Sequence, residues 1–523
     1  MVRNIKQINF SNILGWVSLT LLTLVTFGTL AAVYVKSHNN FTLTPADFKI
    51  IKFTAYQALI SATISSILGI FLARALTRQS FIGKSILIII LGAPFILPVV
   101  VAILGLISVF GRNGLFNNIL GILGFENISI YGLHGIIIAN IFFNLPLVSR
   151  LLLHGWNSIP AEQLRLAESL GFNKQDIFFL IELPMLRTRL PGIFAVVFLI
   201  CVSSFSIALT LGGGPKSTTI ELAIYQAFRY DFDLSKAANL AMVQFILCFM
   251  ITVLVIWTQK TQSFQVSFDR VIVKWTRSNN NLIDWLIICL SSIFLIIPLL
   301  IILIEGIFSL HLIDASILVS LVRSILVAFG AVVICLFITF SLGNVIVTSN
   351  ITSKVRWLME SSAYFIIASS PLVIGTGFFI FLFPIINPIK IVFPMTALIN
   401  AIMAVPFSLR IILPAMQKIN QDYGKLSESI GLRGYEKFLN LTLPRMKREI
   451  GFSVGLISAL SIGDLGVVTL FSSPQSGTLP LTIYRLMGSY QMDSAKAAAF
   501  LLLISCFLIF LLTDRLARSN VKD

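Results

Sequence analysis

Charged side chains are scarce in this sequence. Only 11% of the 523 residues are Asp, Glu, Lys or Arg, against about 25% in soluble domains. Hydrophobic residues make up 57%, and the mean hydropathy is +0.94. These values exclude an ordinary soluble globular protein. They predict a chain that crosses a membrane many times.

Side chains that carry out catalysis, metal binding or redox chemistry are also few. The five cysteines all lie in apolar runs and none forms a CxxC pair, which favours inert buried thiols. The four histidines are scattered singly. The glycines at 212–214 precede neither GKS nor GKT and follow no strand, so they do not form an ATP site. A polytopic membrane enzyme is therefore disfavoured.

Apolar runs of about 20 residues predict twelve spans. The first run is too long for the core of a signal peptide and no convincing cleavage site follows it, so we expect a retained anchor. The predicted spans are 13–35, 54–76, 85–110, 131–153, 190–212, 238–258, 282–304, 320–347, 359–384, 390–412, 451–471 and 497–514.

The positive charge of the chain follows this topology. Its formal net charge is +16, from 38 Lys and Arg against 22 Asp and Glu. When the twelve spans are laid out, most of the basic residues fall on the side of the N-terminus, as the positive-inside rule requires. The charge thus predicts cytoplasmic N- and C-termini in a lipid bilayer, and no nucleic acid partner.

Two polar segments repeat one another in this apolar chain. RLAESLGFNKQDIFFLIELP at 165–184 and KLSESIGLRGYEKFLNLTLP at 425–444 align without gaps, 260 positions apart. Such a match indicates an internal duplication. We therefore predict a first half at 1–258, a cytoplasmic linker at 259–281 and a second half at 282–523. Each half has six spans and one polar island, the first island at about 158–184 and the second at about 418–444.

Each island is predicted to form a short helix, a glycine turn and a second helix that ends before Leu-Pro. Ser158 and Asn420 are candidate N-caps, and glycine supplies the turn. Leucine or isoleucine side chains four residues apart share one helical face and form a small apolar ridge rimmed by basic residues. A plain amphipathic connector lying in the lipid interface is the alternative. It does not explain why about 50 positions keep register between the halves.

The island spacing resembles the cytoplasmic EAA loop of bacterial ABC importer permeases, which seats a coupling helix in a cleft of the ATPase subunit. Glycine is followed ten positions later by a hydrophobic residue and then by Leu-Pro, in both copies. The sequence departs from the family where the loop is named, because the expected Glu-Ala-Ala is Arg-Leu-Ala at 165–167 and Lys-Leu-Ser at 425–427. Either these cations or the glutamates that follow them would pair with the ATPase. The resemblance implies ATPase docking through Arg165, Leu166, Ala167, Glu168, Leu170, Gly171, Lys425, Leu426, Ser427, Glu428, Ile430 and Gly431.

The segments 209–241 and 461–491 resemble the thiamine permeases of this group, which are related to the fused ferric-iron permeases. The run TTIELAIYQA at 218–227 is the most specific part. The resemblance implies the type I importer permease fold, with all-helical, pseudo-symmetric halves in the bacterial inner membrane. A periplasmic binding protein would deliver thiamine or its phosphate esters, and two ATPase copies would hold ATP and magnesium. This chain itself would bind no cofactor or metal.

Other transported solutes remain open at this stage. Ferric iron or another small solute is the alternative cargo within the group. A secondary transporter with parallel repeats is disfavoured, because such a protein needs no docking islands.

Three acidic residues are candidates for the transport path. Asp464 follows Gly463 within the eleventh predicted span, where an ionisable group is a functional candidate. It would compensate the charge of a cationic cargo, or it would cap the helix that follows the glycine. Glu221 and Asp231 are expected at the outer mouth.

Overall fold

The computed structural model describes the chain except residues 1–9, 39–42, 93–96, 259–281, most of 349–368, residues 387 and 433, and residues 474–475 and 519–523. The described residues form helices and loops, without a strand. The predicted all-helical class is therefore confirmed. The predicted linker at 259–281 lies outside the described residues, and the division into halves stays a prediction.

The first half contains α1 (Phe10–His38), α2 (Pro45–Arg78), α3 (Lys84–Ile90), α4 (Val99–Phe110), α5 (Leu115–Ile122), α6 (Leu133–Asn157), α7 (Ala161–Ser169), α8 (Lys174–Ile177), η2 (Phe178–Glu182), α9 (Leu183–Val202), α10 (Phe205–Leu211), η3 (Pro215–Ser217), α11 (Ile220–Arg229) and α12 (Leu234–Thr258). The second half contains α13 (Leu282–Phe308), η4 (Leu310–Leu312), α14 (Ala315–Thr348), α16 (Pro371–Leu382), η5 (Pro388–Ile391), α17 (Val392–Ser429), α18 (Gly434–Lys437), η6 (Phe438–Thr442), α19 (Leu443–Arg445), α20 (Lys447–Ile462), α21 (Gly466–Phe471), α22 (Leu479–Gly488) and α23 (Met492–Arg518).

Eleven helical segments among the described residues are long and apolar enough to cross a membrane. The predicted third span, 85–110, is wrong as one continuous helix. α3 ends at Ile90, α4 begins only after Pro98, and the segment long enough to span is Val99–Ile122. Proline lacks a backbone N–H and favours the first turn of a helix, which explains the new start. Of the predicted span 359–384, the structure describes mainly the twelve-residue α16.

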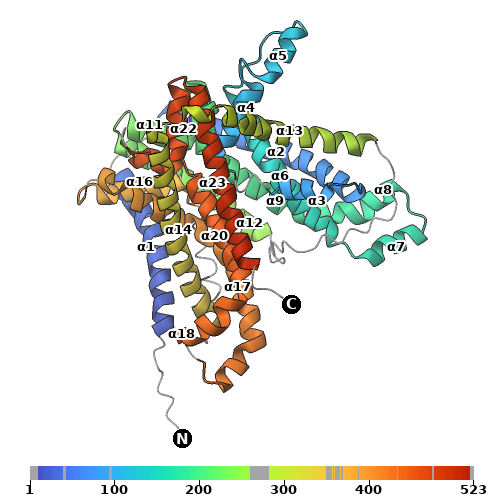
Figure 1. Ribbon diagram of the computed structural model, residues 1–523, viewed down its shortest axis with the longest axis vertical. Coiled ribbons are helices and arrows are strands. Elements are labelled where there is room, and N and C mark those ends of the chain that lie inside the picture. Colours follow the sequence, from blue (N-terminus) through green and yellow to red (C-terminus); the bar gives the residue numbers. More distant parts are fainter. Residues whose placement is uncertain are drawn as a thin grey trace.

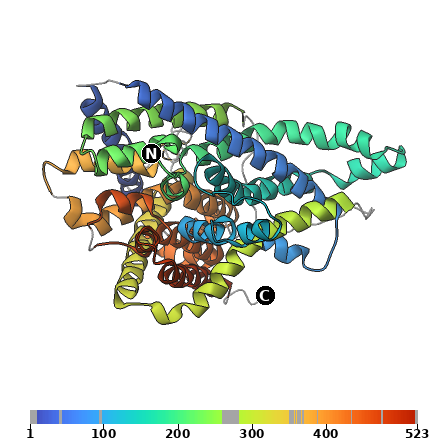
Figure 2. The ribbon, with the colours of Figure 1, turned by 90° about the horizontal axis from the view of Figure 1, so that it is seen from above.

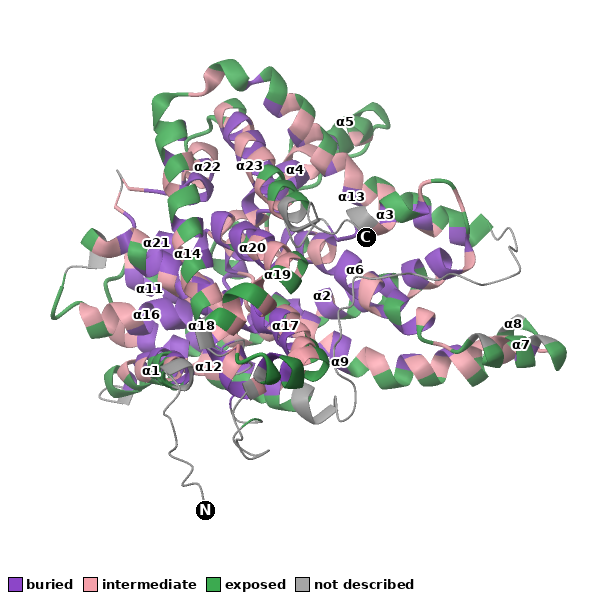
Figure 3. Ribbon diagram, turned by 60° about the horizontal axis from the view of Figure 1, so that its bottom comes forward, coloured by how far each residue is buried: buried purple, intermediate pink, exposed green. Residues whose placement is uncertain are grey.

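The two halves interlock through their first helices. α1 packs against α14 and α16 of the second half, and α13 packs against α2 and α4 of the first half. Glycine permits the closest approaches. A Cβ at Gly15 would lie 2.0 Å from the side chain of Val345, and one at Gly105 would lie 2.6 Å from the carbonyl oxygen of Pro298. The halves therefore share one interior, seen as the buried centre of Figure 3.

A polar contact recurs at equivalent places in the two halves. The hydroxyl of Thr54 on α2 accepts a hydrogen bond from the Ile220 backbone N–H, at 2.9 Å. The hydroxyl of Ser324 on α14 accepts one from the Leu479 N–H, at 2.8 Å. The N–H groups in the first turn of a helix have no acceptor within that helix. Each of these contacts supplies an acceptor for one such N–H, in α11 or in α22. The long second helix of each half thus positions the short helix that lies toward the end of the bundle opposite α18 (Figure 1).

Candidate functional site

The first island leaves the bundle as a hairpin. α6 ends at Asn157, α7 and α8 follow, and the pair lies at the far right of the molecule (Figures 1 and 2). The sequence predicted that Ser158 is an N-cap, and this prediction is wrong. The residue closes α6 instead, since its N–H bonds to the carbonyl of His154, and its hydroxyl accepts a hydrogen bond from Arg189 at 3.0 Å.

The second island is a continuation of a span. α17 runs for 38 residues from Val392 to Ser429, so the predicted N-cap Asn420 lies inside a helix. That prediction is wrong because contacts within the island support the helix there. Lys437 donates to the Asn420 side chain at 3.2 Å, and Arg445 donates to the Tyr423 hydroxyl at 2.8 Å while its guanidinium lies over the same ring.

The glycine turns form as predicted. Gly171 has φ of 70° and Gly431 has φ of 81°, in the left-handed region that glycine adopts without steric cost. In the first island the Phe172 N–H bonds to the carbonyl of Ala167, and in the second Leu432 bonds likewise to Ser427. This bond of a residue to the fifth one before it is the Schellman ending of a helix.

The second helix of each island does not end before Leu-Pro. A five-residue π-helical segment, η2 or η6, carries the chain directly into α9 or α19, whose first residue is that leucine. The proline at the second position of α9 or α19 has no N–H to donate to the preceding turn, and that turn is π-helical rather than α-helical. The expected break before Leu-Pro is therefore wrong, and each island continues without a break into α9 or α19.

The π-helical segments are attached to the long second helices of their halves. Arg74 on α2 forms an ion pair with Glu182 at 2.7 Å and lies over the ring of Phe178. In the second half, the rings of Phe340 on α14 and Phe438 meet edge to face at 5.3 Å. The ion pair was not predicted from the sequence, although a glutamate beside an apolar run was a visible signal. These contacts attach each island to α2 or α14.

The predicted apolar ridges are on the surface. The exposed fractions are 61% for Leu166, 61% for Leu170, 54% for Leu426 and 66% for Ile430. Such large exposed apolar side chains at matched positions are typical of contact surfaces. Figure 3 shows α7 and α8 largely exposed at the edge of the molecule, well apart from α18.

The other predicted docking residues flank these ridges. Arg165 and Lys425 are exposed, whereas Ala167 and Ser427 are each 2% exposed beneath the ridge. The structure therefore places two cations, rather than the small residues, at the rim of the surface. Glu168 and Glu428 stand on the same helices, but their side chains lie outside the described part of the chain.

Asp464 lies in the interior near the contact of the two halves. Its carboxylate accepts a hydrogen bond from the Gly466 N–H at 3.2 Å, at the start of α21. This is the capping geometry of the alternative interpretation. The glycines on either side of it approach the first half, since a Cβ at Gly463 would lie 3.0 Å from Pro98 and one at Gly466 3.5 Å from the ring of Phe205. Its role toward the cargo stays a prediction.

The other two acidic candidates differ in their surroundings. Glu221 on α11 is 1% exposed and accepts a hydrogen bond from Ser370, the N-cap of α16 in the second half. It therefore links the halves and is not available on an outer surface in this conformation. Asp231 is exposed, at the turn between α11 and α12, and lies 3.8 Å from Lys236.

Comparisons with known proteins identify the family of this chain. Residues 65–259 match the family described as the binding-protein-dependent transport system inner membrane component. The thiamine transport system permease protein of Escherichia coli (strain K12) is 36% identical over 485 residues, which cover 90% of both chains. This chain belongs to that family of transport permeases. Its relative in Haemophilus influenzae, named likewise, is 31% identical over 88% of this chain and 87% of the relative.

The permease also has a partial relative with another named cargo. A probable sulfate transport system permease protein from Helicosporidium is 32% identical over 191 residues, 36% of this chain. Membership in this family identifies the chain as a multi-pass membrane protein of a binding-protein-dependent ABC system. The family is a transport component rather than a catalytic enzyme. The partial match also means that membership alone does not name the transported solute.

Proposed function

We propose that this permease is the membrane subunit of an ATP-driven importer that moves thiamine, or its phosphate esters, from the periplasm to the cytoplasm. The observation that carries the proposal is similarity over 90% of both chains to permeases named for thiamine transport. Similarity to the sulfate permease covers only 36% of this chain, which favours thiamine over other solutes of the group.

The repeated ridges support engagement of two copies of an ATPase subunit. Each island presents two exposed apolar side chains four residues apart, and Figure 1 shows α7 and α8 well apart from α18. Binding of one ATPase copy to each island explains both the repeated ridge and the separation of the islands. ATP and magnesium belong to these partners, and a periplasmic binding protein delivers the cargo at the opposite side. The two termini and both islands face the cytoplasm in this arrangement.

The fold supplies a means of alternating access. ATPase closure draws the islands together, and the ion pair of Arg74 with Glu182 and the ring contact of Phe340 carry that movement to α2 and α14. The permease is then the two-state element. The ATPase shifts its population only because it binds one state better than the other.

Growth of a thiamine auxotroph tests the proposal. Cells that lack their own thiamine permease receive this chain with its ATPase and binding protein, and are grown on limiting thiamine. We expect growth to be restored, and to be lost when the ATPase cannot hydrolyse ATP. Growth that stays dependent on a large excess of thiamine, with the permease present in the membrane, would contradict the proposal.

A further inference from the structure

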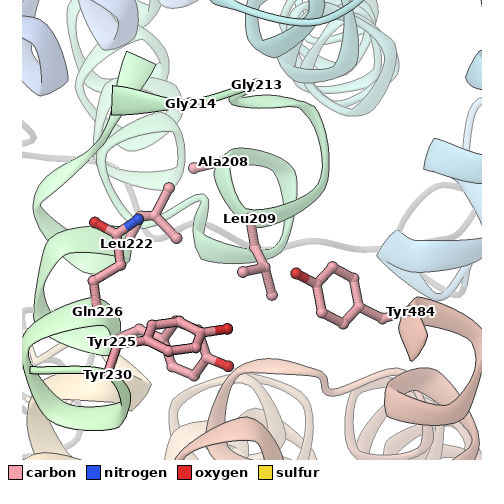
Figure 4. A pocket seen from close by; sticks show the side chains of 9 residues that line it. All are labelled: Ala208, Leu209, Gly213, Gly214, Leu222, Tyr225, Gln226, Tyr230 and Tyr484. Atoms are coloured by element: carbon pink, nitrogen blue, oxygen red, sulfur yellow. The ribbon is translucent and has the colours of Figure 1, made fainter. Parts of the chain in front are cut away.

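A cavity of about 160 Å³ lies where the two halves meet, toward the end of the bundle opposite α18. Tyr225 and Tyr230 line it from the first half, and Tyr484 lines it from the second. Figure 4 shows the hydroxyls of all three tyrosines pointing toward the space beside Leu209. A cavity needs about 10–15 Å³ to hold one water molecule. The volume of this cavity is therefore large enough for a flat ring of a small solute.

The position of the cavity follows from the repeat. Tyr225 is the sixth residue of α11 and Tyr484 is the sixth residue of α22. These two helices begin at the equivalent hydrogen bonds to Thr54 and Ser324 described above. The cavity therefore lies at the contact of the two halves, with eight lining residues from the first and Tyr484 from the second. In a permease with two such halves, a solute crosses between them.

The lining is aromatic and uncharged. The rings of Tyr225 and Tyr230 meet edge to face at 5.8 Å, and Phe205 supports Tyr225 from behind at 5.5 Å. Tyr225 is 7% exposed and Tyr230 is 66% exposed, so one ring is held in place while the other faces the opening. Gln226 adds an amide, and none of the lining residues is Asp, Glu, Lys or Arg. Such a wall offers ring faces, ring edges and hydrogen-bonding groups together.

The nearby charges decide which kind of ring fits. Arg229 is in the last turn of α11, four residues after Tyr225 and thus on the same helical face, and Arg485 directly follows Tyr484 on α22. Arg485 is held at this place by a hydrogen bond to the carbonyl of Ser473, at 2.9 Å. Two guanidinium groups disfavour a cationic ring beside the tyrosines. A neutral heteroaromatic ring with hydrogen-bonding substituents meets no such penalty.

We propose that Tyr225, Tyr230 and Tyr484 form a cargo subsite that holds the neutral aminopyrimidine ring of thiamine during transport. This inference rests on the proposed function. The cationic thiazolium ring then lies away from the two arginines. Asp464, which accepts the Gly466 N–H, lies near the same Phe205 ring, because a Cβ at Gly466 would be 3.5 Å from that ring and Tyr225 packs against it.

Equilibrium binding of radiolabelled thiamine to the purified complex of permease and ATPase tests the subsite. Loss of a stacking ring weakens the binding of a base by about 5- to 150-fold. We expect that range for Tyr225→Leu and for Tyr484→Leu, whereas Tyr225→Phe keeps the ring and most of the binding. Tyr56→Leu is the matched control, since Tyr56 is exposed on α2 and does not line the cavity. ATPase co-purification with each variant verifies that it is assembled.

Competition identifies the ring. Free 4-amino-5-hydroxymethyl-2-methylpyrimidine should displace thiamine from the wild-type complex, and an N-methylated thiazolium should not. Displacement by the thiazolium alone, unchanged binding in both leucine variants, or no saturable binding to a wild-type complex that imports thiamine would each overturn the subsite. A wild-type complex that is active but imports no thiamine would instead overturn the proposed function.

Discussion

Truncation of one apolar ridge is expected to weaken ATPase binding by a predictable amount. Leu166 and Leu170 are each 61% exposed. Complete burial of a leucine side chain is worth about 1.5–3 kcal/mol, so covering the exposed part is worth about 1–2 kcal/mol for each residue. The double variant Leu166→Ala/Leu170→Ala should therefore lose about 2–4 kcal/mol at this island. That loss corresponds to about 30- to 800-fold weaker binding.

The assay measures binding of the ATPase to permease in lipid nanodiscs. Binding is detected by interferometry at a series of ATPase concentrations. The second island still binds, so we expect the single high-affinity phase to separate into a strong and a weak phase. Adding Leu426→Ala and Ile430→Ala should weaken both phases. Leu24→Ala is the control, because this α1 leucine is 71% exposed but distant in sequence from both islands. Wild-type affinity in the four-residue variant would refute docking through the ridges.

Three further predictions concern the turn, the topology and the path. Gly171→Val should impair ATPase co-purification, because φ of 70° is strained for a β-branched residue; normal co-purification would show that the turn tolerates another conformation. In a chain with Cys289 replaced by serine, a cysteine at Ser169 should be labelled only from the cytoplasm and one at Asp231 only from the periplasm, and the reverse pattern would invert the topology. Asp464→Asn should reduce thiamine uptake while ATPase assembly survives if the carboxylate compensates the cargo charge; normal uptake per permease molecule would leave it the capping role alone.

The repeat in the sequence predicts much of the docking site. Gly171 and Gly431 were identified from register, and both adopt the left-handed turn. The exposed leucines follow from helical spacing of four. These features are local, so a pattern within 20 residues contains the information they need.

Features that depend on tertiary contacts were not predictable in the same way. Asn420 has the composition of a helix start, yet contacts from Lys437 keep α17 continuous through it. The π-helical segments differ from an α-helix by one hydrogen-bond register, which no residue type specifies. The tyrosine cavity joins Tyr225 and Tyr484 from separate halves, and their matched positions in the repeat gave no measure of how close they lie.

Thiamine import through this chain is tested most directly by uptake of radiolabelled thiamine into proteoliposomes that contain the purified permease and ATPase, with loaded binding protein on one side and ATP on the other. We expect thiamine to accumulate in the ATP-containing compartment. This accumulation should be lost when ATP is omitted or when the four ridge residues are truncated. ATP hydrolysis stimulated by the loaded binding protein without any thiamine accumulation would contradict this expectation.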